Sequence, residues 1–171
     1  ARLLEKTGAR FIDCRGVGEG QVIALDGESL EILLTPGHTE NDVCFKADDF
    51  LVTGDTLFNG TVGNCFSGDL GRFFTSLKKL TAFPLETKIY AGHDYVQESI
   101  KMAASIEEDN PDIEAYLQKY DPGLVVSTLA DELQVNPYLR FNAPSMTARL
   151  EKREMPVKTE KQRFFSIMEI Y

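Results

Sequence analysis

This sequence of 171 residues is poor in cysteine, histidine and basic residues, and it contains no long hydrophobic run. Because no apolar stretch reaches about 18 residues, no segment is predicted to span a membrane. Lysine and arginine total 18 against 27 acidic residues, and the net charge of −9 argues against nucleic acid or an anionic membrane as the main partner. The three cysteines, Cys14, Cys44 and Cys65, lack C-x-x-C spacing, so we expect free, mostly buried thiols in a reducing cytoplasm.

The hydrophobic fraction of 43% and the charged fraction of 26% are those of an ordinary globular protein. Short β-like runs separated by glycines predict an antiparallel meander in the first third of the chain. Asp69 is expected to cap a helix, and Ser127 and Thr159 are each expected to open one. The sequence thus predicts a β-rich half followed, from about residue 96, by a helical half. The expected strands are 10–14, 21–25, 29–35, 42–46, 50–53 and 87–91.

Three times in this chain, a β-like run ends in glycine and is followed directly by a side chain that can bind a metal ion. Glycine lets the backbone turn tightly or approach a ligand closely, and turns at strand ends lift side chains clear of a sheet. Imidazole and carboxylate groups are ligands of zinc, iron and related ions. The pattern therefore indicates a hydrolytic metal site made by His38, Asp55 and His93, which follow Gly37, Gly54 and Gly92.

The spacing of His38, Asp55 and His93 leaves the type of metal site open. The three residues lie too far apart for a finger-type zinc site, so the fold would have to gather them from separate loops. Taken singly, each has an ordinary role as a hydrogen-bonding histidine or a turn-capping aspartate, but the repeated context favours a shared site. By number alone they fit either the facial triad of non-haem iron or an open catalytic zinc site.

The residues around these positions resemble known motifs. T-P-G-H-T at 35–39, G-D-T-L-F at 54–58 and G-H-D-Y at 92–95 resemble, in this order, three motifs of the metallo-β-lactamase superfamily. The resemblance is close to the glyoxalase II family, the hydroxyacylglutathione hydrolases. It extends to 127–140, where N-P-Y-L-R at 136–140 is similar to a signature in the helical C-terminal domain of that family.

The resemblance implies an α+β fold in two domains. Residues 1–96 would form the second half of a metallo-β-lactamase αββα sandwich, and residues 97–171 would form a helical C-terminal domain. It also implies two divalent metal ions, zinc or iron, with His38 binding the first, His93 binding the second and Asp55 bridging both. A hydroxide shared by the metals would attack a thioester such as S-lactoylglutathione.

One departure from the family concerns the first metal motif, H-x-H-x-D-H, which is absent from this chain. We therefore expect the chain to be the C-terminal part of a longer protein that supplies about half the ligands. On this expectation the 171 residues alone bind metal weakly and are inactive. An incomplete sandwich should also expose a hydrophobic sheet face or edge, which a missing N-terminal segment or a dimer partner would cover.

A second departure concerns the carrier thiol. Where the family offers a lysine and a tyrosine to glutathione, this chain has Asn64 and Phe66, although Tyr95 matches a substrate-contacting tyrosine. An arginine and a lysine that bind glutathione carboxylates would fall near Met168 and Tyr171. The substrate is therefore expected to be a small thioester, with the identity of its thiol open.

Two other functions compete with thioester hydrolysis. The first is a persulfide dioxygenase of the same fold with a single iron, which G-H-D-Y at 92–95 fits equally well but the long helical tail does not. The second is a metal-free interaction module. The presence of His38, Asp55 and His93 together argues against it for the full-length protein, but it stays open as a description of the 171 residues alone.

Overall fold

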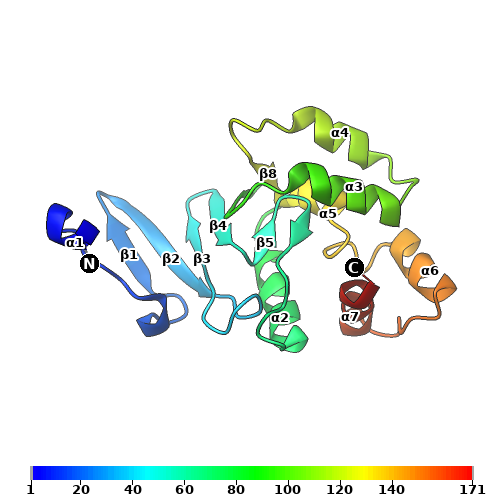
Figure 1. Cartoon of the computed structure of the whole chain (residues 1–171), viewed down its shortest axis with the longest axis horizontal. Helices are drawn as coiled ribbons and strands as arrows, with labels where there is room; N and C mark the ends of the chain where they lie inside the picture. Colours follow the sequence, from blue (N-terminus) through cyan, green and yellow to red (C-terminus); the bar gives the residue numbers. More distant parts are fainter. Residues whose placement is uncertain (1, 171) are drawn as a thin grey trace.

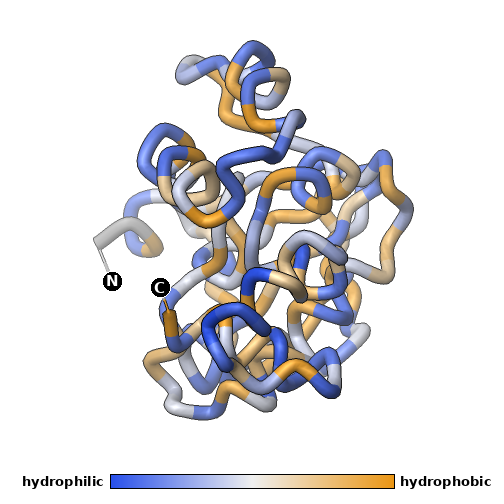
Figure 2. The backbone as a smooth tube through the Cα atoms, turned by 90° about the vertical axis from the view of Figure 1, so that its right-hand side faces the viewer, coloured by the Kyte–Doolittle hydropathy of each residue, from blue (hydrophilic) through white to orange (hydrophobic). Residues whose placement is uncertain are grey.

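A computed structural model describes residues 2–170 of the chain, so Ala1 and Tyr171 lie outside the described residues. A six-stranded sheet occupies the N-terminal end of the molecule, and most of the helices gather at the other end (Figure 1). Among residues 2–170, every helix is too short or too polar to span a membrane. Hydrophobic and hydrophilic stretches alternate along the backbone (Figure 2).

The sheet has the strand order β1-β2-β3-β4-β7-β8. The first four strands pair antiparallel in sequence order, which confirms the predicted meander. Strand β7 then runs parallel to β4, and β8 pairs antiparallel with β7. A two-stranded ribbon, β5 with β6, stands apart from this sheet. The bounds are β1 (Val22–Leu25), β2 (Glu28–Leu34), β3 (Val43–Ala47), β4 (Phe50–Gly54), β5 (Leu57–Phe58), β6 (Thr61–Val62), β7 (Lys88–Ala91) and β8 (Ser127–Thr128).

Two of the helices begin at polar caps that the sequence predicts. Asp69 accepts a hydrogen bond from the Arg72 amide at the start of α2, and Thr159 accepts one from the Gln162 amide at the start of α7. The bounds are α1 (Arg2–Thr7), a 3-10 turn (Cys14–Gly16), α2 (Leu70–Leu80), α3 (Val96–Ile106), α4 (Asp112–Lys119), α5 (Leu129–Val135), α6 (Pro144–Lys152) and α7 (Glu160–Ile170).

Two predicted elements are wrong in detail. Residues 10–14 form no strand, because the Asp13 side chain binds the Arg15 amide and guanidinium and closes a turn there. Ser127 does not open a helix, since it belongs to β8. The helix α5 begins two residues later, behind Thr128, which forms a capping box with Asp131.

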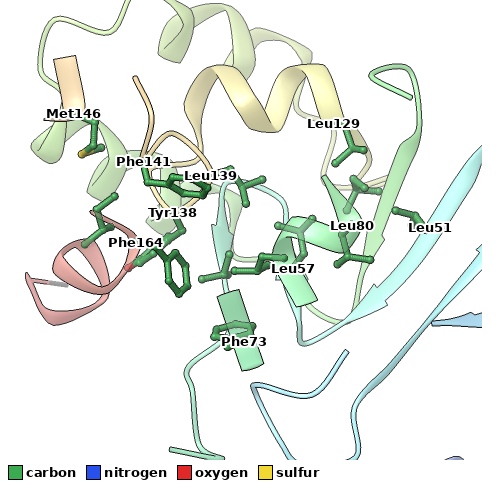
Figure 3. Packing of buried hydrophobic residues seen from close by; sticks show 14 of the residues in the cluster. Leu51, Leu57, Phe73, Leu80, Leu129, Tyr138, Leu139, Phe141, Met146 and Phe164 are labelled. Atoms are coloured by element: carbon green, nitrogen blue, oxygen red, sulfur yellow. The ribbon is translucent and has the colours of Figure 1, made fainter. Parts of the chain in front are cut away.

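One large hydrophobic core joins the sheet to the helical region (Figure 3). The strand register puts Leu33, Cys44, Leu51 and Ile89 on the sheet face that enters this core. Residues from both sides of position 96 therefore share one core, and the division into domains 1–96 and 97–171 stays a prediction. Residues labelled in Figure 3 are Leu51, Leu57, Phe73, Leu80, Leu129, Tyr138, Leu139, Phe141, Met146 and Phe164.

The opposite face of the sheet is apolar but incompletely covered. The register places Phe45, Val52 and Tyr90 in one row on that face, beside the buried Ile32. The Val52 side chain is 37% exposed, and Phe45 and Tyr90 are partly exposed. Apolar side chains that stay partly exposed on an open sheet face form a candidate contact surface.

We expect the 171-residue chain to self-associate through this face as its concentration rises. Light scattering coupled to size-exclusion chromatography should give a mass above that of one chain, and Val52→Lys should return the mass to one chain. Val22→Lys is the matched control, because Val22 is exposed on the other face of the same sheet. A monomer at every concentration would contradict the expectation.

Candidate metal centre

His38, Asp55 and His93 leave the sheet at the same edge. Strands β2, β4 and β7 run in one direction, since β2 and β4 each pair antiparallel with β3 and β7 pairs parallel with β4. Their carboxyl ends therefore all lie at this edge, with the antiparallel β3 between β2 and β4, and each end leads within a few residues to one of the three side chains. The strand pattern that singled them out in the sequence thus has a direct structural cause.

The glycines before the three residues serve two different purposes. Gly54 has a φ of +50°, a left-handed conformation that other residues rarely adopt. Gly37 and Gly92 instead allow close approach, because a Cβ atom at Gly37 would overlap the Phe73 ring. A Cβ atom at Gly92 would lie 2.5 Å from Asp55 Oδ1. The Gly92 amide also donates to the Gly54 carbonyl at 2.8 Å, which ties the two turns together.

The Asp55 carboxylate lies between the two imidazole rings. His38 Nε2 is 3.7 Å from Asp55 Oδ2, and His93 Nε2 is 3.6 Å from Asp55 Oδ1. Each histidine therefore faces a different oxygen of the same carboxylate. When two ligand atoms each lie about 2.0–2.2 Å from one tetrahedral zinc ion, the separation between the two ligand atoms is similar to these nitrogen–oxygen distances.

The hydrogen bonding of His38 prepares its ring for metal binding. Its Nδ1 lies 2.9 Å from the Asn64 backbone carbonyl, which can only accept a hydrogen bond. In the neutral ring the proton is therefore on Nδ1, and the Nε2 lone pair faces Asp55. A backbone carbonyl in this role is typical of metal-binding histidines.

The described residues contain no group of three or more histidine, cysteine, aspartate or glutamate side chains that could hold one ion. This agrees with the geometry, because the three residues form two nitrogen–oxygen pairs that share Asp55. Each pair supplies two ligands, which is half of a tetrahedral set. The donor chemistry and spacing fit two metal positions that share Asp55, each of which would need further ligands.

A cavity of about 460 Å³ opens onto these three residues. The predicted substrate-binding residues Asn64, Phe66 and Tyr95 all line it. Phe66 is 72% exposed and packs edge-on against the His38 ring, with 5.0 Å between centroids. Tyr95 is 45% exposed and packs edge-on against Phe58, which the sequence analysis did not single out.

Other polar residues near the centre are held in structural roles. Asp94 accepts a hydrogen bond from the Val96 amide at the start of α3, and its other oxygen accepts one from the Tyr120 hydroxyl at 2.5 Å. This bond raises the pKa of Tyr120 to about 12. Burial raises the pKa of the Cys44 thiol to about 11, so this thiol stays protonated at neutral pH.

The remaining two cysteines differ from the expectation of mostly buried thiols. Cys14 is exposed and Cys65 is partly exposed, although all three cysteines are free, as expected. Met168, near which the family would place a carboxylate-binding charge, packs against the main core, and Tyr171 lies outside the described residues.

Solved structures with a similar fold are metallo-β-lactamases and their relatives. ETHE1 from Myxococcus xanthus matches with a TM-score of 0.58 and 23% identity over 90% of this chain and 50% of that one. A metallo-β-lactamase from Staphylococcus aureus subsp. aureus COL matches with a TM-score of 0.54 and 22% identity over 79% of this chain and 37% of that one. The sheet and its site edge therefore belong to part of a metallo-β-lactamase fold.

Sequence comparison narrows this class. Residues 94–167 match the family model described as hydroxyacylglutathione hydrolase C-terminus. Hydroxyacylglutathione hydrolases of Idiomarina loihiensis and Photobacterium profundum are 35% and 38% identical over 87% and 77% of this chain. The chain is a relative of the hydroxyacylglutathione hydrolases (glyoxalase II) in the metallo-β-lactamase superfamily. It spans 61% and 55% of the length of these two curated relatives.

Proposed function

We propose that this chain forms part of a metal-dependent hydrolase that cleaves a thioester of the hydroxyacylglutathione type in the cytoplasm. The observation that carries the proposal is the placement of one carboxylate, Asp55, between two imidazoles at 3.6 and 3.7 Å. Metal ions bound there would supply an activated hydroxide and stabilise the oxyanion of the tetrahedral intermediate.

The protein's own contribution is to position the metal-binding side chains and to line the substrate cavity. Asp55 shares its two oxygens between the histidines, and the Asn64 carbonyl fixes the ring of His38. Phe58, Phe66 and Tyr95 form apolar walls for the acyl group and its carrier. Because a thiolate leaves readily, the reaction depends more on activated water than on an acid that protonates sulfur.

The alternative within this fold is an iron-dependent persulfide dioxygenase. The match of residues 94–167 to a hydrolase C-terminal region favours the hydrolase. The test uses the complete protein, meaning this chain with the N-terminal part that the resemblance implies. Hydrolysis of S-lactoylglutathione without oxygen uptake, with close to two metal ions per chain, supports the proposal. Oxygen consumption with one iron and no thioester cleavage would overturn it.

The 171-residue chain alone is proposed to bind metal weakly and to lack turnover, because it supplies two ligands to each metal position. Metal content after dialysis, measured beside that of the complete protein, tests this. Tight binding of two ions by the 171 residues would show that the ligand set is already complete.

Introducing a lysine at Asn64 tests the substrate assignment. Asn64 lines the cavity with an exposed side chain, and its backbone carbonyl, which binds His38, is unaffected by the change. Asn64→Lys in the complete protein should lower KM for a glutathione thioester a few-fold at low salt, with kcat little changed and the gain lost at high salt. Gln118→Lys, exposed on α4 away from the cavity, is the control for added charge. An unchanged KM would show that the carrier does not reach this loop.

A further inference from the structure

A buried glutamate connects the helical region to the site. Glu132, in α5, has no exposed surface and accepts four hydrogen bonds. Its Oε1 accepts from the hydroxyls of Tyr116 and Ser127, both at 2.7 Å. Its Oε2 accepts from the Gly60 amide at 2.8 Å and the Asn136 side chain at 3.0 Å. Four donors satisfy both oxygens of the carboxylate.

The surrounding groups are arranged to donate to this carboxylate. Ser127 accepts a hydrogen bond from the Asn59 side chain at 2.6 Å, which directs its own proton towards Glu132. Asn136 donates to the Thr61 carbonyl at 2.9 Å as well as to Glu132. Burial raises the pKa of the Glu132 carboxyl, and the four donors act against that rise. The carboxylate at the centre of this network has all its donors in place, and buried hydrogen bonds of this kind restrict the positions of the groups that make them.

The network holds the turn between β5 and β6. Gly60, with a φ of +87°, and Thr61 are bound by Glu132 and Asn136. This ribbon begins directly after Asp55 and Thr56 and continues into Gly63 and Asn64. Residues of the ribbon line the cavity, and the Asn64 carbonyl binds Nδ1 of His38. The turn therefore lies on the covalent path between Asp55 and the group that orients His38.

We propose that Glu132 is a positioning residue for the metal centre: by holding the β5–β6 turn from the helical region, it keeps Asn64 in place to orient His38. The inference rests on the proposed function of the site and assigns a role to the helical region in building it. It also explains the Asn136 side chain of the N-P-Y-L-R motif, which binds both Glu132 and the ribbon.

The test compares Glu132→Gln with Glu107→Gln in the 171-residue chain, without metal. In Glu132→Gln, an NH₂ group would replace one carboxylate oxygen and face hydrogen-bond donors that need an acceptor. The loss of these hydrogen bonds would release the β5–β6 turn. Glu107 is a matched control, because it is 2% exposed and accepts hydrogen bonds from Arg140 and Ser145 within the helical region. None of the hydrogen bonds described for Glu107 involves the β5–β6 ribbon.

The chain has two histidines, so ¹⁵N-histidine labelling reports the ring tautomer of His38 directly, and His38→Ala assigns its signals. At a pH where imidazole is neutral, the original chain should hold His38 with its proton on Nδ1. In Glu132→Gln, the His38 ring should be a mixture of tautomers. The backbone amides of the β5–β6 ribbon should undergo hydrogen–deuterium exchange about tenfold faster, or more. Glu107→Gln should change neither quantity at the site.

An unchanged tautomer and ribbon exchange in Glu132→Gln, or equal changes in Glu107→Gln, would overturn the proposal. If Glu132→Gln does not fold, Tyr116→Phe replaces it, because this variant removes only one donor to Glu132. It should produce the same changes on a smaller scale. An unchanged His38 tautomer and ribbon exchange in Tyr116→Phe would then overturn the proposal. These readouts need no metal. Absence of metal binding by the complete protein would therefore count against the proposed function and leave the role of Glu132 to be judged separately.

Discussion

Replacing His38 with alanine in the complete protein is expected to lower bound metal to about one ion per chain or less and to reduce thioester hydrolysis by about two orders of magnitude or more. The physical reason is the pairing of His38 Nε2 with Asp55 Oδ2, which would supply two of the ligands at one proposed metal position. Metal content by elemental analysis and kcat/KM for S-lactoylglutathione are the two measurements.

Phe66→Leu is the matched control for His38→Ala. Phe66 packs against the His38 ring but has no atom that binds a metal ion. The Phe66→Leu variant should therefore keep its metal content and change KM for the thioester. If His38→Ala keeps its full metal content, His38 is not a ligand, and the interpretation of the site as two nitrogen–oxygen pairs is wrong.

Replacing Gly92 with alanine is expected to have the second largest effect. The added Cβ atom would lie 2.5 Å from Asp55 Oδ1, and it would also press on the Gly54 carbonyl at 3.2 Å. Because neither the carboxylate nor the backbone can yield without moving the shared ligand, metal affinity of the complete protein should fall about tenfold to a hundredfold. Competition with a chelator of known affinity gives the change.

Gly18→Ala provides the comparison for Gly92→Ala. A Cβ atom at Gly18 would have no neighbour within 4 Å, and the residue does not adopt a left-handed conformation. The metal affinity of this variant should equal that of the original protein. Equal affinities in both variants would mean that the Asp55 carboxylate does not occupy the position described here when metal is bound.

Local patterns in the sequence were sufficient to find His38, Asp55 and His93. Each follows a strand and a glycine, and such turns depend on residues that are neighbours in sequence. The meander and the caps at Asp69 and Thr159 are local for the same reason. Patterns of this kind could be predicted because the interactions that form them lie within one turn or one hairpin.

The features that the sequence analysis missed depend on distant partners. Ser127 lies in β8 because Ile89 of β7 pairs with it, a partner that no local pattern indicates. The contact between Glu132 and the Gly60 amide joins residues 72 positions apart. The Asn64 backbone carbonyl orients His38, whereas the sequence analysis assigned Asn64 a role through its side chain. Main-chain groups carry no residue-type signal, so only the structure reveals this contact.

Asp55 is proposed to serve two metal positions with one carboxylate. The most direct test is anomalous diffraction at the metal absorption edge from crystals of the complete protein. Two peaks are expected, one about 2.0–2.2 Å from both His38 Nε2 and Asp55 Oδ2, and the other equally close to His93 Nε2 and Asp55 Oδ1. A single peak that contacts neither Asp55 oxygen, or no peak near these side chains, would contradict it.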